Sequence, residues 1–215
     1  MSRPLSLVHH VRLCRVACAV ARADSAALEA SLMECLHEPG LDPEVVAEAI
    51  LQGIPYSGFP GAVEALGLWR SHTNTAIASD ALGLPVSPTE PPTPPPTAGL
   101  DRGAQVFAEI YGDLAPRVRA ELRRRHPHLE AWIISFAYGG VMAGSRLALL
   151  TIEALGVASL LVQARRPPLH SHLRGALRTG WSSADLNALI TELESQCDAE
   201  TLAFARSVIR REAAT

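Results

Sequence analysis

The chain has 215 residues and a formal net charge of −3, with 48% hydrophobic but only 5% aromatic residues. A chain of this length forms one large domain or two small ones, and can bury roughly two-thirds of its unfolded surface. Its apolar residues are mostly Ala, Leu and Val, which predicts an all-α fold. All 19 basic residues are arginine, which excludes Schiff-base chemistry, a pyridoxal phosphate linkage and a lysine phosphate loop. The acidic balance gives no indication of a nucleic-acid partner.

The N-terminal segment does not resemble a signal peptide, because polar residues interrupt its apolar run: His9, His10, Arg12 and Arg15. The longest apolar stretch, residues 147–162, is shorter than the ~20 residues that a membrane span needs. It also contains Glu153. We therefore expect a cytoplasmic protein in a reducing compartment, with no membrane partner.

The four cysteines show no zinc or redox spacing: Cys14, Cys18, Cys35 and Cys197. Cys14 and Cys18 share one helix face, and we expect them to be small buried apolar residues. His170 and His172 diverge on a helix, and no neighbouring Asp, Glu or Cys completes a ligand set. No metal site is predicted.

In the first half of the chain, the residues that begin and end helices are clear. Gly40 suits a left-handed helix end, and Asp42 followed by Pro43 predicts the start of the next helix. Apolar residues then recur at helical spacing and predict a core face: Val45, Val46, Ile50 and Ile54.

Residues 84–99 contain seven prolines and predict a semi-rigid polyproline linker. This linker separates a first unit, residues 1–83, from a second unit, residues 100–215. The two units align without a gap when 140 is added to the number: Gly40 with Gly180, Asp42 with Ser182, Ser31 with Ser171, and Ile50 with Ile190. We interpret the chain as two tandem helical repeats. Leu32 stands opposite His172, so only the second repeat retains a candidate proton-transfer pair.

The segment from Ile152 to Gly180 contains a long apolar helix, a basic proline-containing corner and a short helix with His172. It resembles the signature of the carboxymuconolactone decarboxylase family, which includes the alkylhydroperoxidase-D-like enzymes. In the peroxidase branch a Glu is followed by Cys-x-x-Cys and then by His. Glu153 and His172 stand at those two places, whereas Arg165 and Pro168 replace the cysteines.

Three further segments extend this resemblance. Residues 131–142 look like the family's aromatic lead-in, and residues 42–66 are similar to its third helix. The Tyr-x-Gly-x-Pro turn and the His-apolar-Arg spacing of the decarboxylase branch are also present: Tyr56, Gly58 and Pro60, and His172, Leu173 and Arg174. The resemblance implies an alkylhydroperoxidase-D-like helical fold, a homo-oligomer that is a trimer or hexamer, and chemistry without a cofactor.

The resemblance also implies that Glu153 and His172 meet at the mouth of a pocket. His172 would then act as general acid and base, with Glu153 fixing its tautomer and orientation. The residues alone leave another interpretation open. A carboxyl in an apolar helix needs a partner, and Arg146 or Arg174 could supply one in a purely structural ion pair.

Arg165 is the predicted anion-binding residue, because its planar guanidinium can hold both oxygens of a carboxylate. A solvated corner is the alternative for this position. Arg174 lies on roughly the opposite helix face from His172, and could instead make a structural or subunit contact. The other candidates for substrate contact are His170, Trp132, Tyr138 and Tyr56, of which the aromatic residues could equally be core.

Three functions remain open from the sequence. The first is a carboxymuconolactone decarboxylase-like enzyme that performs cofactor-independent acid–base chemistry on a small carboxylated or lactone substrate. The second is a non-catalytic, oligomeric binding or scaffold protein that retains the fold. The third is a thiol peroxidase that uses a displaced cysteine such as Cys197.

Overall fold

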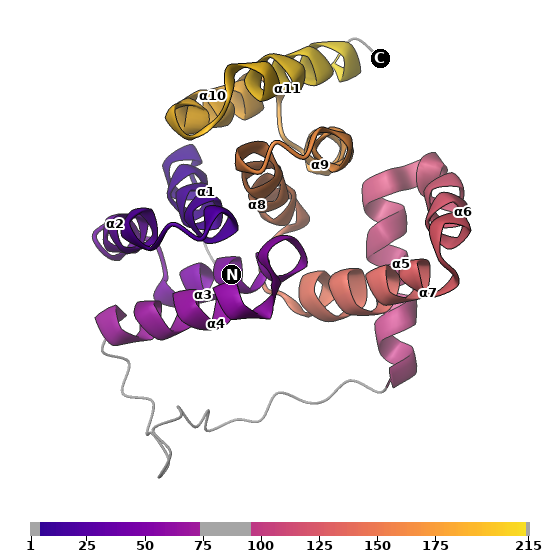
Figure 1. Ribbon diagram of the computed structural model, residues 1–215, viewed down its shortest axis with the longest axis horizontal. Helices are drawn as coiled ribbons and strands as arrows, with labels where there is room; N and C mark the ends of the chain where they lie inside the picture. The colour runs from indigo at the N-terminus through magenta and orange to yellow at the C-terminus, as the bar shows by residue number, and fades with distance from the viewer. Residues whose placement is uncertain (1–4, 74–95, 214–215) are drawn as a thin grey trace.

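A computed structural model describes residues 5–73 and 96–213 of the chain (Figure 1). Within these two ranges every regular element is helical, which confirms the prediction of an all-α fold. None of the helices in this part of the chain is long and apolar enough to cross a membrane.

The first repeat consists of the helices α1 to α4, of which α3 begins at the predicted cap, Asp42. Their bounds are α1 (Leu7–Arg22), α2 (Ser25–Leu36), α3 (Pro43–Leu51) and α4 (Ile54–Thr73). Asp42 caps α3 by accepting a hydrogen bond from the backbone N–H of Glu44 at 2.9 Å. Helix α4 is broken near its start, where Gly58 has a φ of +76°.

The predicted second unit, residues 100–215, includes a middle group of helices that pack as a smaller layer beside the two repeated sets of helices, α1–α4 and α8–α11 (Figure 1). The elements of this middle group are α5 (Pro96–Tyr111), a 3₁₀ turn (Gly112–Leu114), α6 (Ala115–Arg125), α7 (Pro127–Trp132) and the π-helical segment η2 (Ile133–Met142). Gly103 of α5 and Gly139 of η2 let the two backbones approach closely, since a Cβ at either position would clash with a carbonyl oxygen of the other segment. This layer has its own small apolar core.

The second repeat has the same order of elements as the first. It consists of α8 (Leu149–Val162), α9 (Arg166–Thr179), α10 (Ser183–Leu193), a 3₁₀ turn (Glu194–Gln196) and α11 (Ala199–Glu212). Ser182 caps α10 through the backbone N–H of Asp185, as Asp42 caps α3. Gly40 and Gly180 both have positive φ, +82° and +121°, at the two corresponding helix ends.

The two repeats share one core. Helices α1 and α8 lie side by side at its centre, and the residues buried around them come from both repeats (Figure 1). Cys14 and Cys18 donate hydrogen bonds from α1 to the carbonyls of Ala154 and Ala158, both at 3.6 Å. These two cysteines are therefore buried packing residues, and each partner lies 140 positions further along the chain.

The proline-rich linker predicted over residues 84–99 is only partly testable. Residues 84–95 lie outside the described residues. Residues 96–99 belong to the first turn of α5 and not to a spacer, which corrects the predicted boundary. A proline is tolerated there, because the first turn of a helix has no intrahelical acceptor for its missing N–H.

Candidate active site

Glu153 is buried at the centre of the second repeat. It lies in α8, whose residues 151–161 are all buried, and its own exposed fraction is 0%. Its Oε2 lies 3.0 Å from Nδ1 of His172, which comes from the neighbouring helix α9 and is 9% exposed. An ionised carboxylate can only accept hydrogen bonds, so beside ionised Glu153 Nδ1 is the donor, and in the neutral imidazole Nε2 then keeps its lone pair. The partner of Glu153 is thus His172, and neither Arg146 nor Arg174 takes that role.

Two glycines make room for this pair. A Cβ at Gly175 would clash with Oε2 of Glu153 and would lie 2.8 Å from its Cδ. A Cβ at Gly156 would lie 2.9 Å from Nδ1 of His172 and 2.6 Å from the hydroxyl of Tyr56. The carboxyl and the imidazole can meet between α8 and α9 only because both positions lack a side chain.

Tyr56 of the first repeat completes the group. Its hydroxyl lies 3.3 Å from Nε2 of His172, and the two rings meet edge to face at a centroid distance of 5.5 Å. The phenol O–H can donate to the free lone pair of Nε2. Glu153, His172 and Tyr56 therefore form one continuous line of hydrogen bonds.

The second oxygen of Glu153 has no such partner. Oε1 is fully buried and makes no hydrogen bond with the described residues. Leaving a buried charged acceptor unsatisfied costs free energy, of order 1–3 kcal/mol or more. A buried acceptor without a partner requires an explanation, and a catalytic role is one of those known.

A cavity of about 950 Å³ opens beside His172. All three tyrosines of the chain line it: Tyr56, Tyr111 and Tyr138. Burial raises the pKa of each of these phenols, and the nearby carboxyl of Glu153 adds to the shift. The rest of the wall is largely apolar, with Phe107 and Met142 among its residues. Its volume lies at the upper end of the range for sites that bind small organic molecules.

The rim of the cavity is basic. The whole chain is acidic. The described residues of the rim nevertheless include four arginines and one glutamate: Arg117, Arg125, Arg165, Arg174 and Glu121. Arg125 pairs with Glu121, and Arg174 pairs with Glu212 on α11 at 2.8 Å. Arg117 and Arg165 have no ion-pair partner in the described part of the chain. Arg165 thus lies at the cavity as predicted for an anion-binding residue, and Arg117 is a candidate that the sequence did not reveal.

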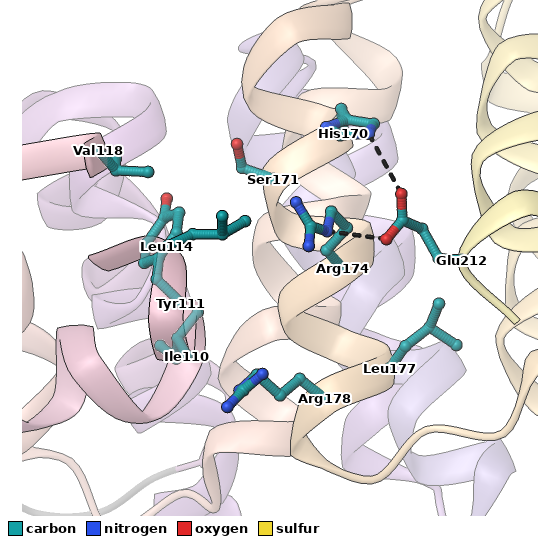
Figure 2. A pocket seen from close by; sticks show the side chains of 10 residues that line it. All are labelled: Ile110, Tyr111, Leu114, Val118, His170, Ser171, Arg174, Leu177, Arg178 and Glu212. Atoms are coloured by element: carbon teal, nitrogen blue, oxygen red, sulfur yellow. Dashed lines mark ion pairs between the residues drawn. The ribbon is translucent and has the colours of Figure 1, made fainter. Parts of the chain in front are cut away.

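His170 does not line this cavity, which corrects its prediction as a substrate contact there. It lies on a smaller neighbouring hollow of about 350 Å³, where Figure 2 shows it beside Arg174 and Glu212. His170 Nε2 accepts a hydrogen bond from Arg211 at 2.7 Å. Burial lowers the pKa of this imidazole, so it favours the neutral form. The two hollows share one wall, to which Arg174 and Tyr111 belong.

Trp132 also requires a correction. It ends α7 with 64% of its surface exposed, stacks on His128 and lies outside both cavities. Six residues later on the same run of helix, Tyr138 does line the main cavity. The aromatic lead-in therefore contributes one residue to the wall and directs another to solvent.

No cysteine lines either cavity. Burial raises the pKa of Cys35 to about 12 and that of Cys197 to about 11, and the pKa values of Cys14 and Cys18 are raised further. A thiol with such a pKa carries little of the nucleophilic thiolate at neutral pH. Among the described residues, no group of three or more His, Cys, Asp or Glu side chains is placed to hold a metal ion.

Comparison with known proteins identifies a distant relative but no family. No family model matches the chain. "Peroxisomal protein 2" of Schizosaccharomyces pombe is 25% identical over 179 residues, which cover 76% of this chain and 78% of the relative. Its name contradicts the expectation of a cytoplasmic protein and points to the peroxisome. The expectation rested on the lack of a signal peptide, and that feature does not distinguish these two compartments.

The two glycines provide a test of the site's geometry. We expect Gly175→Ala to lower the free energy of unfolding by about 1–3 kcal/mol, because the added methyl group displaces the Glu153 carboxyl from His172. Gly67→Ala in α4 is the control, since nothing lies within 4 Å of a Cβ there, and it should be neutral or stabilising by up to ~1 kcal/mol. Urea unfolding of both variants measures the difference. Equal stabilities would show that the carboxyl is not packed against Gly175.

Proposed function

We propose that the protein is a cofactor-independent acid–base enzyme that acts on a small carboxylated or lactone substrate, in the manner of the carboxymuconolactone decarboxylases. The observation that carries the proposal is the contact between His172 Nδ1 and the buried carboxyl of Glu153, at the wall of a cavity large enough for an organic ligand. A base hydrogen-bonded to a carboxyl that orients it, at the wall of a cavity, is the arrangement expected of an acid–base catalytic site.

In this proposal His172 moves the proton. Loss of CO₂ from a carboxylated lactone leaves an electron pair on carbon, delocalised toward the lactone carbonyl. The protonated imidazole of His172 gives its proton to that carbon, and takes another from solvent to complete the cycle. Glu153 stabilises the imidazolium and holds its orientation, because the carboxyl accepts from Nδ1 throughout.

The rim arginines would bind the substrate's carboxylate. Arg165 and Arg117 approach the cavity from different elements, the start of α9 and helix α6. Both are free to pair with a ligand, whereas Arg174 is already held by Glu212. The apolar side chains of the wall, Phe107 and Met142 among them, would contact the apolar part of the substrate.

The peroxidase alternative is disfavoured, because no cysteine lines the cavity and burial raises the pKa of each thiol. The scaffold alternative has no specific observation in its favour, and the buried carboxyl oxygen that lacks a partner among the described residues is evidence against it. We further propose a peroxisomal location, on the name of the relative, and the homo-oligomer stays a prediction.

Replacing His172 tests the reaction. Turnover of 4-carboxymuconolactone should fall about 10²–10⁴-fold in His172→Gln, because the variant retains a polar side chain but cannot exchange a proton. Release of CO₂ and loss of the lactone absorbance measure the rate. Glu153→Gln should lose less, since it retains a hydrogen-bonding group beside Nδ1. Equal rates in the wild type and His172→Gln would remove His172 from catalysis, and the absence of turnover in the wild type would refute this substrate.

Replacing Arg165 tests anion binding independently of turnover. Arg165→Gln should weaken binding of the lactone carboxylate about tenfold at low salt, with a smaller effect at high salt. Arg166→Gln is the matched control, because Arg166 is the next residue but pairs with Glu200 at 2.7 Å and does not line the cavity. Calorimetric titration gives the dissociation constant of each variant at low and at high ionic strength. The idea fails if the two variants bind equally.

A further inference from the structure

We infer that Tyr56 is a catalytic residue of this site, and that its hydroxyl relays the proton between Nε2 of His172 and the ligand. The inference rests on the proposed function. It makes the active site a composite of both repeats, because Tyr56 belongs to α4 of the first repeat and His172 to α9 of the second.

The geometry puts Tyr56 between His172 and the ligand. Nδ1 of the imidazole is occupied by Glu153 at 3.0 Å, so Nε2 is its only free nitrogen. That nitrogen is already 3.3 Å from the hydroxyl of Tyr56, and the ring of Tyr56 lines the cavity. A ligand in the cavity that exchanges a proton with His172 must therefore reach Nε2, and the hydroxyl of Tyr56 lies at that nitrogen.

Neighbouring residues of the second repeat hold Tyr56 in this place. The side-chain amide of Gln163 donates to the backbone carbonyl of Tyr56 at 3.2 Å and to that of Ala21 at 3.2 Å. Gly58, with a φ of +76°, bends the chain directly after this turn. Gly156 leaves the space that the hydroxyl occupies. Gln163 thus fixes the backbone of Tyr56, and Gly156 leaves room for its hydroxyl beside His172.

The other two tyrosines of the cavity do not share this arrangement. The hydroxyls of Tyr111 and Tyr138 lie 3.5 Å from each other, and neither has a hydrogen bond with His172. Tyr111 therefore provides a comparison of the same chemical type in the same cavity. It allows the hydroxyl of Tyr56 to be tested without a change in the class of side chain.

The relay balances. The imidazolium of His172 gives its Nε2 proton to the oxygen of Tyr56, while the O–H of Tyr56 goes to the substrate carbon that holds the electron pair. The phenol is neutral before and after the transfer, and His172 regains one proton from solvent. The high pKa that burial gives the phenol favours its neutral form on both sides of the step.

The test compares Tyr56→Phe with Tyr111→Phe in the full-length protein. With 4-carboxymuconolactone as substrate, Tyr56→Phe should lose at least about 100-fold in kcat with little change in KM, and Tyr111→Phe at most about tenfold. A second readout needs no turnover: in protein labelled with ¹⁵N-histidine, the Nε2 resonance of His172 should shift in Tyr56→Phe and stay in place in Tyr111→Phe.

The outcomes separate the inference from the reaction. A full loss of kcat in Tyr56→Phe together with the Nε2 shift supports both. If the wild type turns over but Tyr56→Phe loses less than about tenfold, the relay is wrong and the proposed function stands. If the wild type is inactive on the lactone and the Nε2 resonance shifts, the reaction is wrong and the shared proton of Tyr56 and His172 is supported. An unchanged Nε2 resonance overturns the inference in every case.

Discussion

The structure depends on one costly arrangement, a carboxyl placed inside a helix that is buried on all sides. Removing Glu153 from water is unfavourable by several kcal/mol unless another group satisfies it. His172 satisfies one oxygen, and two glycines provide the space for that contact. The second oxygen stays without a partner among the described residues. The arrangement is therefore a poor way to stabilise a fold and a good way to maintain an acid–base pair beside a cavity.

The first repeat shows which residues occupy the positions of Glu153 and His172 when no acid–base pair is present. The residues that lie 140 positions earlier than Glu153 and His172 are Leu13 and Leu32, and both are fully buried. Helix α1 thus fills its centre with a leucine where α8 has a carboxyl. The first repeat packs against α8, and its Tyr56 contacts His172. Under the proposed function, the first repeat mainly supports the second around one shared core, and the second supplies the acid–base pair.

Much of the fold could be predicted from the sequence, because local signals determine it. Gly40, Asp42, Gly180 and Ser182 end or begin helices through their own backbone and side-chain preferences, and they do so in the structure. The resemblance to the carboxymuconolactone decarboxylase family likewise implied that Glu153 and His172 meet, and they do so from adjacent helices. The predicted linker extended to residue 99, whereas α5 begins at Pro96, since prolines in a first turn and in a linker look alike in sequence.

The rest of the site depends on tertiary packing. Nothing in the local sequence distinguishes Trp132, which is exposed, from Tyr138, which lines the cavity, because the direction of each side chain follows from how η2 crosses α5. In the sequence, Arg117 is one of several arginines in a basic helix. Only the packing of α6 places it at the cavity rim. The contact of Tyr56 with His172 joins residues 116 positions apart, and the repeat alignment does not predict it.

The central claim is that the carboxyl and the imidazole serve chemistry and not folding, and the first repeat suggests the direct test. The free energy of unfolding of the double variant Glu153→Leu/His172→Leu, which gives the second repeat the residues of the first, should equal that of the wild type or exceed it by about 1–4 kcal/mol. Urea denaturation measures it. A double variant that is less stable than the wild type by several kcal/mol would contradict the account, because the pair would then be a structural element of the core.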